Sequence, residues 1–165
     1  MLIDVAEGME FLHNTANIIH GDLKPANVLL KASPDGYGYT AVVADFGLSR
    51  MLDATHESSI YRTTSLGTVN YMSPELLVSG RLTRKADSWA FGIIMIEIWT
   101  GESAYGTMSP AQIFFSLTQQ HRAPACPLEC PAEYASIVAG CLCMEPEERW
   151  DFGQILRGLK KLRPV

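Results

Sequence analysis

Apolar side chains recur at helical spacing along most of this chain and predict a mainly helical fold. The first helical pattern runs from Leu2 to about Asn14, with its apolar residues near one face. Residues Arg84 to Trp99 are apolar on all sides, which is typical of a helix buried in a core. Gly101 follows as a C-cap glycine. Three shorter helices are expected over Ser109–Gln120, Ala132–Leu142 and Asp151–Leu162.

Two short apolar runs predict a small antiparallel ribbon. Its strands are Val28–Leu30 and Val42–Val43, and the second lies in a run, Thr40–Ala44, that the pattern indicates to be buried. Between them, Lys31–Gly38 carries the Pro, Asp and Gly of a turn. From Leu48 to Met72 the pattern is polar and has no clear period. A long irregular segment in a compact domain is typical of a functional lid or binding loop.

Composition favours one globular domain. The 165 residues are 47% apolar and 19% charged, which is sufficient for a core. A formal net charge of −5 argues against general nucleic-acid binding, because such proteins normally carry a basic face. Asp4 and Glu7 near the N-terminus do not fit a signal peptide. The longest apolar stretch, Trp89–Trp99, is interrupted by Glu97 and is shorter than the ~20 residues of a membrane span. We expect a cytoplasmic protein, or one on the cytosolic side of a membrane if its parent is a receptor.

The four cysteines, Cys126, Cys130, Cys141 and Cys143, raise the question of a zinc site. Their spacings, C-x3-C and C-x-C, fit structural zinc sites poorly. A disulfide framework is not expected in a cytosolic chain of this size. Free thiols, buried or half-buried, are the favoured interpretation over zinc.

The polar loop from His20 to Asn27 carries the candidate chemistry. It places Asp22, Lys24 and Asn27 close together, and Pro25 stiffens the turn. A carboxylate can accept a proton, an ammonium group can pair with anionic oxygens, and an amide oxygen can bind Mg²⁺. A lone aspartate in a turn is more often a cap or an Asx-turn, so the neighbouring residues carry the hypothesis. The combination indicates a site that handles a phosphate and its metal ion.

Four motifs together resemble those of the protein kinases. His20–Asn27 is similar to the catalytic loop H-R-D-x-x-x-x-N, and Asp45-Phe46-Gly47 matches D-F-G. Ser73-Pro74-Glu75 stands where the family has A-P-E, and Asp87–Gly92 resembles D-x-W-x-x-G on the family's central helix. Arg149 lies near the end, where the family keeps an arginine. Each motif alone is weak, but four in the family's order over nearly the whole chain are specific.

The resemblance implies a C-terminal lobe of a protein-kinase domain over residues 1–165, with an activation segment at about 45–75. Such a lobe is a helical bundle with a small β-ribbon at the active site. The chain contains neither a G-x-G-x-x-G loop nor a V-A-I-K-type lysine, so we expect the N-terminal lobe to be missing. The isolated chain is then expected to be inactive unless that lobe or a partner chain completes it.

The resemblance also implies roles for single residues, with ATP and Mg²⁺ as cofactors. Asp22 would be the catalytic base that accepts the proton of a substrate hydroxyl. Lys24 would neutralise the transferred γ-phosphate, and Thr68 would connect the substrate-docking loop to both. Asn27 and Asp45 would hold the Mg²⁺ ions that bridge the nucleotide phosphates.

A second set of residues is implied to shape the site. Leu29 would form the floor of the adenine pocket, with Ile94 and Ile98 below it; plain core packing is the alternative for these three. Asp87 would hold the backbone of the catalytic loop, because a buried carboxylate needs N–H partners. The set is completed by a stacked pair and by an ion pair that fastens the activation segment, namely His20 with Phe46 and Glu75 with Arg149.

One departure from the family concerns regulation. Gly21 replaces the arginine that pairs with an activation-loop phosphate in many relatives. The hydroxyl cluster Ser58–Ser65 is either a set of phosphorylation sites or an ordinary polar loop. We expect switching by phosphorylation to be weak, or to work through another cation.

The leading hypothesis is a serine/threonine kinase domain of the tyrosine-kinase-like group, since Lys24-Pro25 resembles the serine/threonine-specific subset. It would transfer the γ-phosphate of ATP to Ser/Thr hydroxyls of a protein substrate when the full domain is present. The alternative is a catalytically inactive kinase-lobe remnant that acts as a protein-interaction module. Neither hypothesis involves nucleic acid or direct membrane insertion.

Overall fold

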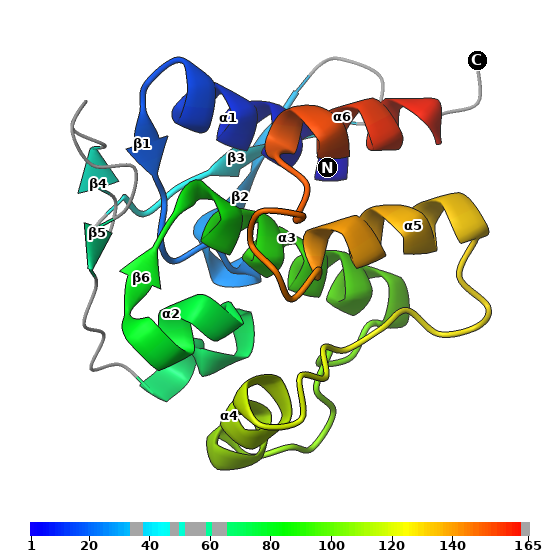
Figure 1. The fold of residues 1–165 in the computed structure, drawn as a ribbon. Coiled ribbons are helices and arrows are strands. Elements are labelled where there is room, and N and C mark those ends of the chain that lie inside the picture. The colour runs from blue at the N-terminus through cyan, green and yellow to red at the C-terminus, as the bar shows by residue number, and fades with distance from the viewer. Residues whose placement is uncertain (34–37, 47–49, 52–58, 61–65, 163–165) are drawn as a thin grey trace.

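The chain folds into helices, with strands confined to short pairs (Figure 1). The computed structural model describes residues 1–33, 38–46, 50–51, 59–60 and 66–162, with backbone only at 50–51, 59–60 and 66–68. Within these residues the helices are α1 (Leu2–Asn14), α2 (Pro74–Ser79), α3 (Arg84–Thr100), α4 (Pro110–Thr118), α5 (Ala132–Cys141) and α6 (Phe152–Lys161). Two 3₁₀ turns, η1 (Pro25–Asn27) and η2 (Leu66–Tyr71), accompany them. The predicted mainly helical fold is confirmed.

Helix α3 is the centre of the core. Its residues are buried from Ala86 to Ile96, and α5 packs along it, while α1 and α6 lie side by side above it (Figure 1). Gly101 ends the helix with a φ of 73°, the left-handed region that favours glycine, and its N–H donates to the carbonyl of Glu97 at 2.8 Å. The last turn departs from the sequence prediction, because the side chains of Ile98 and Trp99 are partly exposed.

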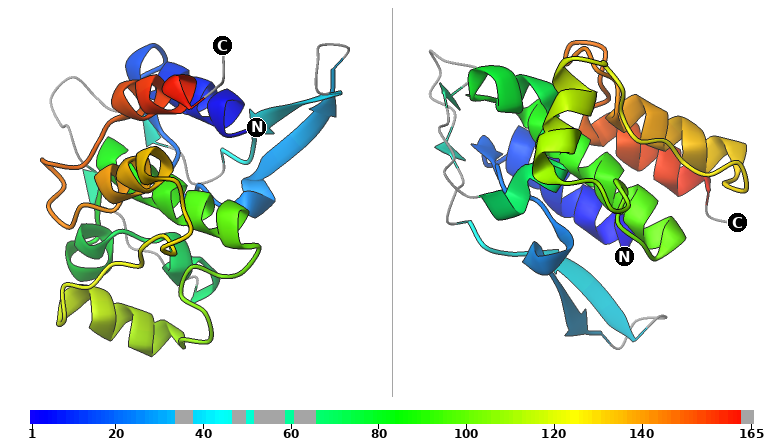
Figure 2. Two further views of the ribbon diagram at one scale, coloured as in Figure 1. Left: turned by 90° about the vertical axis from the view of Figure 1, so that its right-hand side faces the viewer. Right: turned by 90° about the horizontal axis from the view of Figure 1, so that it is seen from below.

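The predicted ribbon consists of β2 (Val28–Ala32) and β3 (Tyr39–Val43), paired antiparallel with Val28 opposite Val43. It projects from the helical body in both views of Figure 2. The prediction that the run Thr40–Ala44 is buried was wrong. Only Ala41 and Val43 are buried on β3, because successive side chains point to opposite faces and one face of the ribbon meets solvent.

Three local features were not predicted from the sequence. Helix α2 has only six residues, too few to show an apolar period, and it ends at Gly80 with a φ of 67°. Two further antiparallel pairs, of two residues per strand, join β1 to β4 and β5 to β6. These strands are β1 (Ile18–Ile19), β4 (Arg50–Met51), β5 (Ser59–Ile60) and β6 (Arg81–Leu82).

The contact of α3 with α5 requires a glycine. A Cβ added at Gly92 would lie 2.7 Å from the Cβ of Cys141 and 2.9 Å from the side chain of Leu142. Neither neighbour is the end of a long flexible side chain, so the helices would have to move apart. We expect Gly92→Ala to lower the free energy of unfolding by about 1–3 kcal/mol, as overpacking does. Urea denaturation measures this change.

A matched control is available in α1. A Cβ at Gly8 would lie 3.6 Å from Val43, an ordinary contact. Gly8→Ala is therefore expected to be neutral or to stabilise by up to ~1 kcal/mol through helix propensity. Equal effects of the two substitutions would contradict a steric requirement at Gly92.

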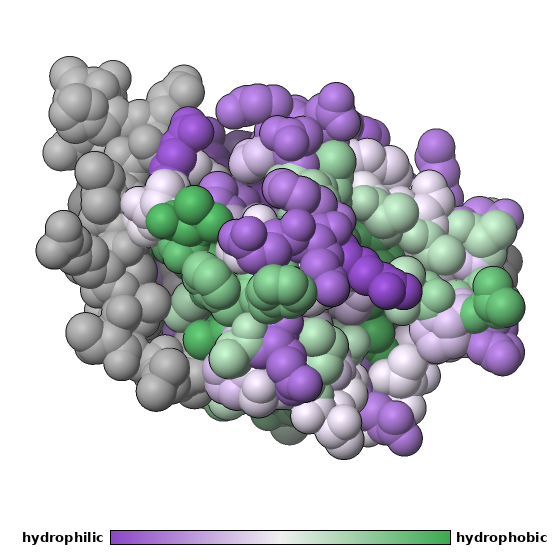
Figure 3. Space-filling view, turned by 60° about the horizontal axis from the view of Figure 1, so that its bottom comes forward, coloured by the Kyte–Doolittle hydropathy of each residue, from purple (hydrophilic) through white to green (hydrophobic). Residues whose placement is uncertain are grey.

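The surface mixes polar and apolar side chains. On the face that carries α4, apolar patches are separated by polar ones (Figure 3), although Phe114 and Phe115 of that helix stay partly exposed. Among the described helices, none combines the length and apolarity needed to cross a membrane. The four cysteines carry free thiols: Cys130 and Cys141 are buried, and Cys126 and Cys143 are half-buried.

Candidate active site

The loop His20–Asn27 is held from below by one buried carboxylate. Asp87 of α3 accepts a hydrogen bond from the backbone N–H of His20 at 2.8 Å and, through its other oxygen, from that of Gly21 at 2.8 Å. The ring of His13, on α1, lies 2.7 Å from the same carboxylate. Gly21 has a φ of 80°, so the glycine is needed by the backbone as well. The carboxylate thus fixes the loop to both helices.

Three polar side chains of this loop converge. The ammonium group of Lys24 lies 2.6 Å from Oδ2 of Asp22. The amide Nδ2 of Asn27 donates to the carbonyl of Asp22 at 2.8 Å and reaches its Oδ2 at 3.4 Å. The other carboxylate oxygen, Oδ1, is buried and has no hydrogen-bond partner among the described residues. A buried acceptor without a donor indicates a group that is satisfied by something else.

The end of β3 is fastened against the same loop. The N–H of Ala44 donates to the carbonyl of Asn27 at 2.8 Å, and the carbonyl of Ala44 lies 3.0 Å from Nε2 of His20. The rings of His20 and Phe46 have their centroids 5.6 Å apart. Asp45, which lies between Ala44 and Phe46 in the chain, is exposed and has a φ of 63°. The backbone hydrogen bond from Ala44 to Asn27 therefore brings Asp45 next to the loop.

The donor set of Asn27 and Asp45 fits Mg²⁺. Asn27 donates through its nitrogen, so its oxygen remains the metal-binding atom, and Asp45 offers a carboxylate. Both are hard oxygen ligands, and Mg²⁺ is usually held by one or two carboxylates together with waters and substrate phosphates. The described residues contain no cluster of three or more His, Cys, Asp or Glu side chains that could hold a metal ion. An ion here would need oxygens from a bound phosphate.

The structure says less about the residues expected at the adenine pocket, and about Thr68, than about the His20–Asn27 loop. Leu29 lies on β2 with 56% of its surface exposed, while Ile94 is buried in α3 and Ile98 is 41% exposed. Plain core packing therefore does not account for Leu29 or Ile98. The backbone of Thr68 belongs to η2, but its side chain lies outside the described residues, as do the side chains of the hydroxyl cluster Ser58–Ser65.

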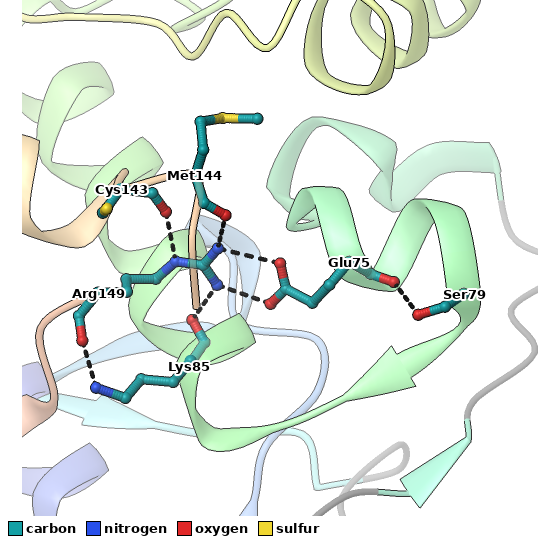
Figure 4. A network of polar contacts seen from close by, with 6 residues as sticks. All are labelled: Glu75, Ser79, Lys85, Cys143, Met144 and Arg149. Atoms are coloured by element: carbon teal, nitrogen blue, oxygen red, sulfur yellow. Dashed lines mark hydrogen bonds and ion pairs between the residues drawn. The ribbon is translucent and has the colours of Figure 1, made fainter. Parts of the chain in front are cut away.

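Glu75 and Arg149 form a bidentate ion pair, shown in Figure 4. The two contacts measure 2.7 and 3.0 Å, and the arginine side chain is fully buried. The other N–H groups of Arg149 donate to the carbonyls of Lys85 at 2.9 Å, Cys143 at 3.0 Å and Met144 at 3.3 Å. All five donors of the guanidinium group are therefore used.

The surroundings of this pair explain how a charge is tolerated in the core. The guanidinium carbon lies 5.1 Å from the ring centroid of the buried Trp89, a cation–π contact. Lys85 in turn donates to the carbonyl of Arg149. These hydrogen bonds could not be predicted from the sequence, because their acceptors are backbone carbonyls that any residue could supply.

Tyr71, at the end of η2, links that turn to α3. Its hydroxyl donates to Glu97 at 2.9 Å. Burial, and then the hydrogen bond and charge of Glu97, raise the pKa of Tyr71 well above its usual range. A tyrosine whose pKa is raised by folding contributes stability that is present below about pH 10 and is lost as the pH rises further.

We therefore expect the unfolding free energy to fall above about pH 10, and to fall less steeply in Tyr71→Phe. Burial also raises the pKa of Tyr105 and Tyr134, so the single variant keeps part of the dependence. At pH 7 the lost hydrogen bond should cost about 1 kcal/mol. Urea denaturation at several pH values measures both effects, and identical slopes for wild type and variant would contradict the assignment.

The chain is similar in sequence to known protein kinases. Residues 1–159 match the family model described as protein tyrosine and serine/threonine kinase. Three relatives align over 98% of the chain: the serine/threonine-protein kinase CTR1 of Arabidopsis thaliana at 35% identity, the probable serine/threonine-protein kinase drkA of Dictyostelium discoideum at 36%, and the serine/threonine/tyrosine-protein kinase HT1 of Arabidopsis at 32%. The chain spans 19%, 24% and 39% of their respective lengths.

Proposed function

The chain belongs to the protein tyrosine and serine/threonine kinase family, and we propose that it is the C-terminal lobe of a serine/threonine kinase domain that transfers the γ-phosphate of ATP to protein hydroxyls. The fold is that of a kinase-like helical lobe. The observation that carries the proposal is the convergence of Asp22, Lys24 and Asn27 on one rigid loop, with Asp45 fastened beside it.

In the proposed reaction, Asp22 accepts the proton of the attacking hydroxyl. Its Oδ1 is the suited atom, because Oδ2 is already bound by Lys24. A base must lie within hydrogen-bond reach of the proton it takes, and a buried unpaired oxygen provides that position. Phosphoryl transfer depends mainly on positioning and electrostatics, so a fixed carboxylate is the main contribution of this loop.

Lys24 and the metal ligands act on the phosphate. The ammonium group of Lys24, held beside the carboxylate, offsets the negative charge of the transferred phosphoryl group. Asn27 and Asp45 would hold Mg²⁺, which when bound neutralises charge on the nucleotide phosphates. We assign Thr68 to positioning the substrate-docking loop and Leu29 to the adenine pocket.

The choice of serine and threonine rests on the lysine at Lys24, followed by Pro25. Two of the three relatives above are named serine/threonine kinases, and the third is named a serine/threonine/tyrosine kinase. Peptide arrays with Ser, Thr or Tyr at a single acceptor position would test this choice.

A non-catalytic interaction module is the alternative function, and the exposed apolar ribbon is compatible with it as well as with the catalytic proposal. Leu29, Leu30, Tyr39 and Val42 each keep more than two fifths of their surface exposed. An apolar surface of this kind normally meets another domain or chain. In the catalytic proposal the ribbon meets an N-terminal lobe, and in the alternative it meets a different protein.

A chimera separates the two. We would join the chain to the nucleotide-binding lobe of the CTR1 kinase and assay transfer of labelled γ-phosphate to a generic protein substrate with ATP and Mg²⁺. Activity that depends on this chain's Asp22 supports the catalytic proposal. A folded chimera that binds ATP but transfers nothing favours the interaction module.

A further inference from the structure

A pocket lies away from the His20–Asn27 loop, where α1 ends and α3 and α6 begin. Its volume is about 200 Å³, whereas a single water needs roughly 10–15 Å³ in this measure. None of the proposed catalytic or metal-binding residues lines it. Its lining residues are His13, Asn14, Arg84, Lys85, Ser88, Asp151 and Phe152.

Two polar atoms near this pocket lack partners. Ser88 lines it and is only 1% exposed, and its hydroxyl has no hydrogen-bond partner among the described residues. The buried Nε of Arg84 is in the same state, although Nη2 of that arginine donates to Asn17 at 2.5 Å. Leaving a buried polar group without a hydrogen-bond partner costs free energy of folding, so the Ser88 hydroxyl and the Arg84 Nε indicate that a bound species completes the pocket.

The charge of the lining favours an anion. Among the described residues, neither Arg84 nor Lys85 forms an ion pair, and Lys85 donates instead to the carbonyl of Arg149. The one carboxylate in the lining, Asp151, accepts the N–H of Gln154 at 2.8 Å through Oδ1. The ring of His13 is engaged with the carboxylate of Asp87 behind it. Two cations against one carboxylate stand out in a chain of net charge −5.

The backbone adds to this preference. Arg84, Lys85 and Ser88 lie in the first turns of α3, a helix of seventeen residues whose N-cap, Thr83, makes no side-chain capping bond. The N-terminus of a helix carries a partial positive charge and attracts anions. The unpartnered hydroxyl of Ser88 is the independent sign that a ligand completes this end.

We propose that this pocket binds a phosphate group, held by the guanidinium of Arg84, the ammonium of Lys85 and the hydroxyl of Ser88. Water could satisfy the hydroxyl and Nε, but it would leave both cations uncompensated. A tetrahedral dianion offers four acceptor oxygens and pairs with guanidinium and ammonium groups through short charge-assisted hydrogen bonds. The phosphate is either a free ion or part of a phosphorylated side chain.

The position of the pocket gives such binding a consequence. His13 lines the pocket and contacts Asp87, which holds the His20–Asn27 loop. Lys85 also lines the pocket and donates a hydrogen bond to the carbonyl of Arg149. A phosphate bound here would therefore stabilise the start of α3, which carries both Asp87 and the residue that contacts Arg149, namely Lys85.

Amide NMR of the ¹⁵N-labelled 165-residue chain tests the proposal. The chain is titrated at constant ionic strength with inorganic phosphate and, separately, with N-acetyl-O-phosphoserine amide. Saturable shifts are expected at the amides of residues 84–88 and Asn14. Ser88→Ala and Arg84→Gln should each weaken binding by about tenfold or more, the usual cost of one hydrogen bond to a charged group. Arg122→Gln, which removes an exposed arginine outside the pocket, should leave it unchanged.

The two titrations and the Ser88→Ala variant distinguish between the possible occupants of the pocket. Binding of inorganic phosphate alone assigns the site to a free ion, and tighter binding of the monoester assigns it to a phosphorylated side chain. Shifts that grow linearly with concentration, or that persist equally in Ser88→Ala, would overturn the proposal in favour of a water-filled cavity. If Arg84→Gln fails to fold, Ser88→Ala carries the test, because it removes only the unpartnered hydroxyl.

Discussion

Replacing Arg149 by methionine should lower the free energy of unfolding by about 3–5 kcal/mol, the usual cost of removing one partner of a buried ion pair. The substitution leaves the mostly buried carboxylate of Glu75 without its cation and removes the donors to the carbonyls of Lys85, Cys143 and Met144. Small domains have only about 5–15 kcal/mol of stability in total, so much of it would be lost. Urea denaturation of the 165-residue chain, followed by circular dichroism, gives the value.

Two companion variants show where the loss arises. Lys160→Met breaks the exposed pair of Lys160 with Glu7, whose side chains are about half exposed, and should cost no more than about 1 kcal/mol. Glu75→Gln combined with Arg149→Met removes both charges, so it should cost less than the sum of the two single variants. A loss below about 1 kcal/mol in Arg149→Met would show that the pair is not a main support of the fold.

Asp22→Asn should lower the rate of phosphoryl transfer by about 10²–10⁴-fold in the chimera with a nucleotide-binding lobe, the range for loss of a general base. Asparagine has the shape of aspartate but cannot accept the proton, and it removes the charge that holds Lys24 at 2.6 Å. Binding of ATP should change much less, because Asn27 and Asp45 remain. Initial rates with labelled ATP, together with nucleotide affinity, separate the two effects.

The control for this prediction is Glu129→Gln, which removes one negative charge from an exposed position in the loop before α5. It should keep full activity, and both variants should keep the thermal unfolding midpoint of the parent chimera within about 2–4 °C, the shift that ~1 kcal/mol causes in a domain of this size. An Asp22→Asn chimera that retains half of the activity would exclude Asp22 as the base.

Long apolar patterns and ordered motifs made the helical part of this fold predictable. The pattern of residues 84–99 located α3, because a run of this length repeats its period several times. Glu75 and Arg149 were expected as a pair through the family resemblance, although they are 74 positions apart and no local pattern connects them. The His20–Asn27 loop was located by its residue types, and its acid, cation and amide do converge.

Other features depended on tertiary contacts that a single sequence does not encode locally. The exposure of β3 could not be predicted, because it depends on which face of the ribbon meets the helical body. The contact of His13 with Asp87 was missed, since an apolar helix face with one histidine gives no sign of a partner on another helix. Gly21 was noticed only as the loss of an arginine, whereas its φ of 80° also favours glycine at this position.

The support of the loop by Asp87 also sets an order of events during synthesis. The carboxylate follows His20 by 67 positions and Gly21 by 66. A ribosome adding about 5–20 residues per second would need roughly 3–13 seconds to make that stretch. Until α3 has emerged and packed, the backbone N–H groups of His20 and Gly21 have no carboxylate to bind, so the nascent chain cannot hold the His20–Asn27 loop in its final shape. Codon changes that slow translation between residues 22 and 87 should therefore lengthen the period in which this segment is open to chaperones and proteases.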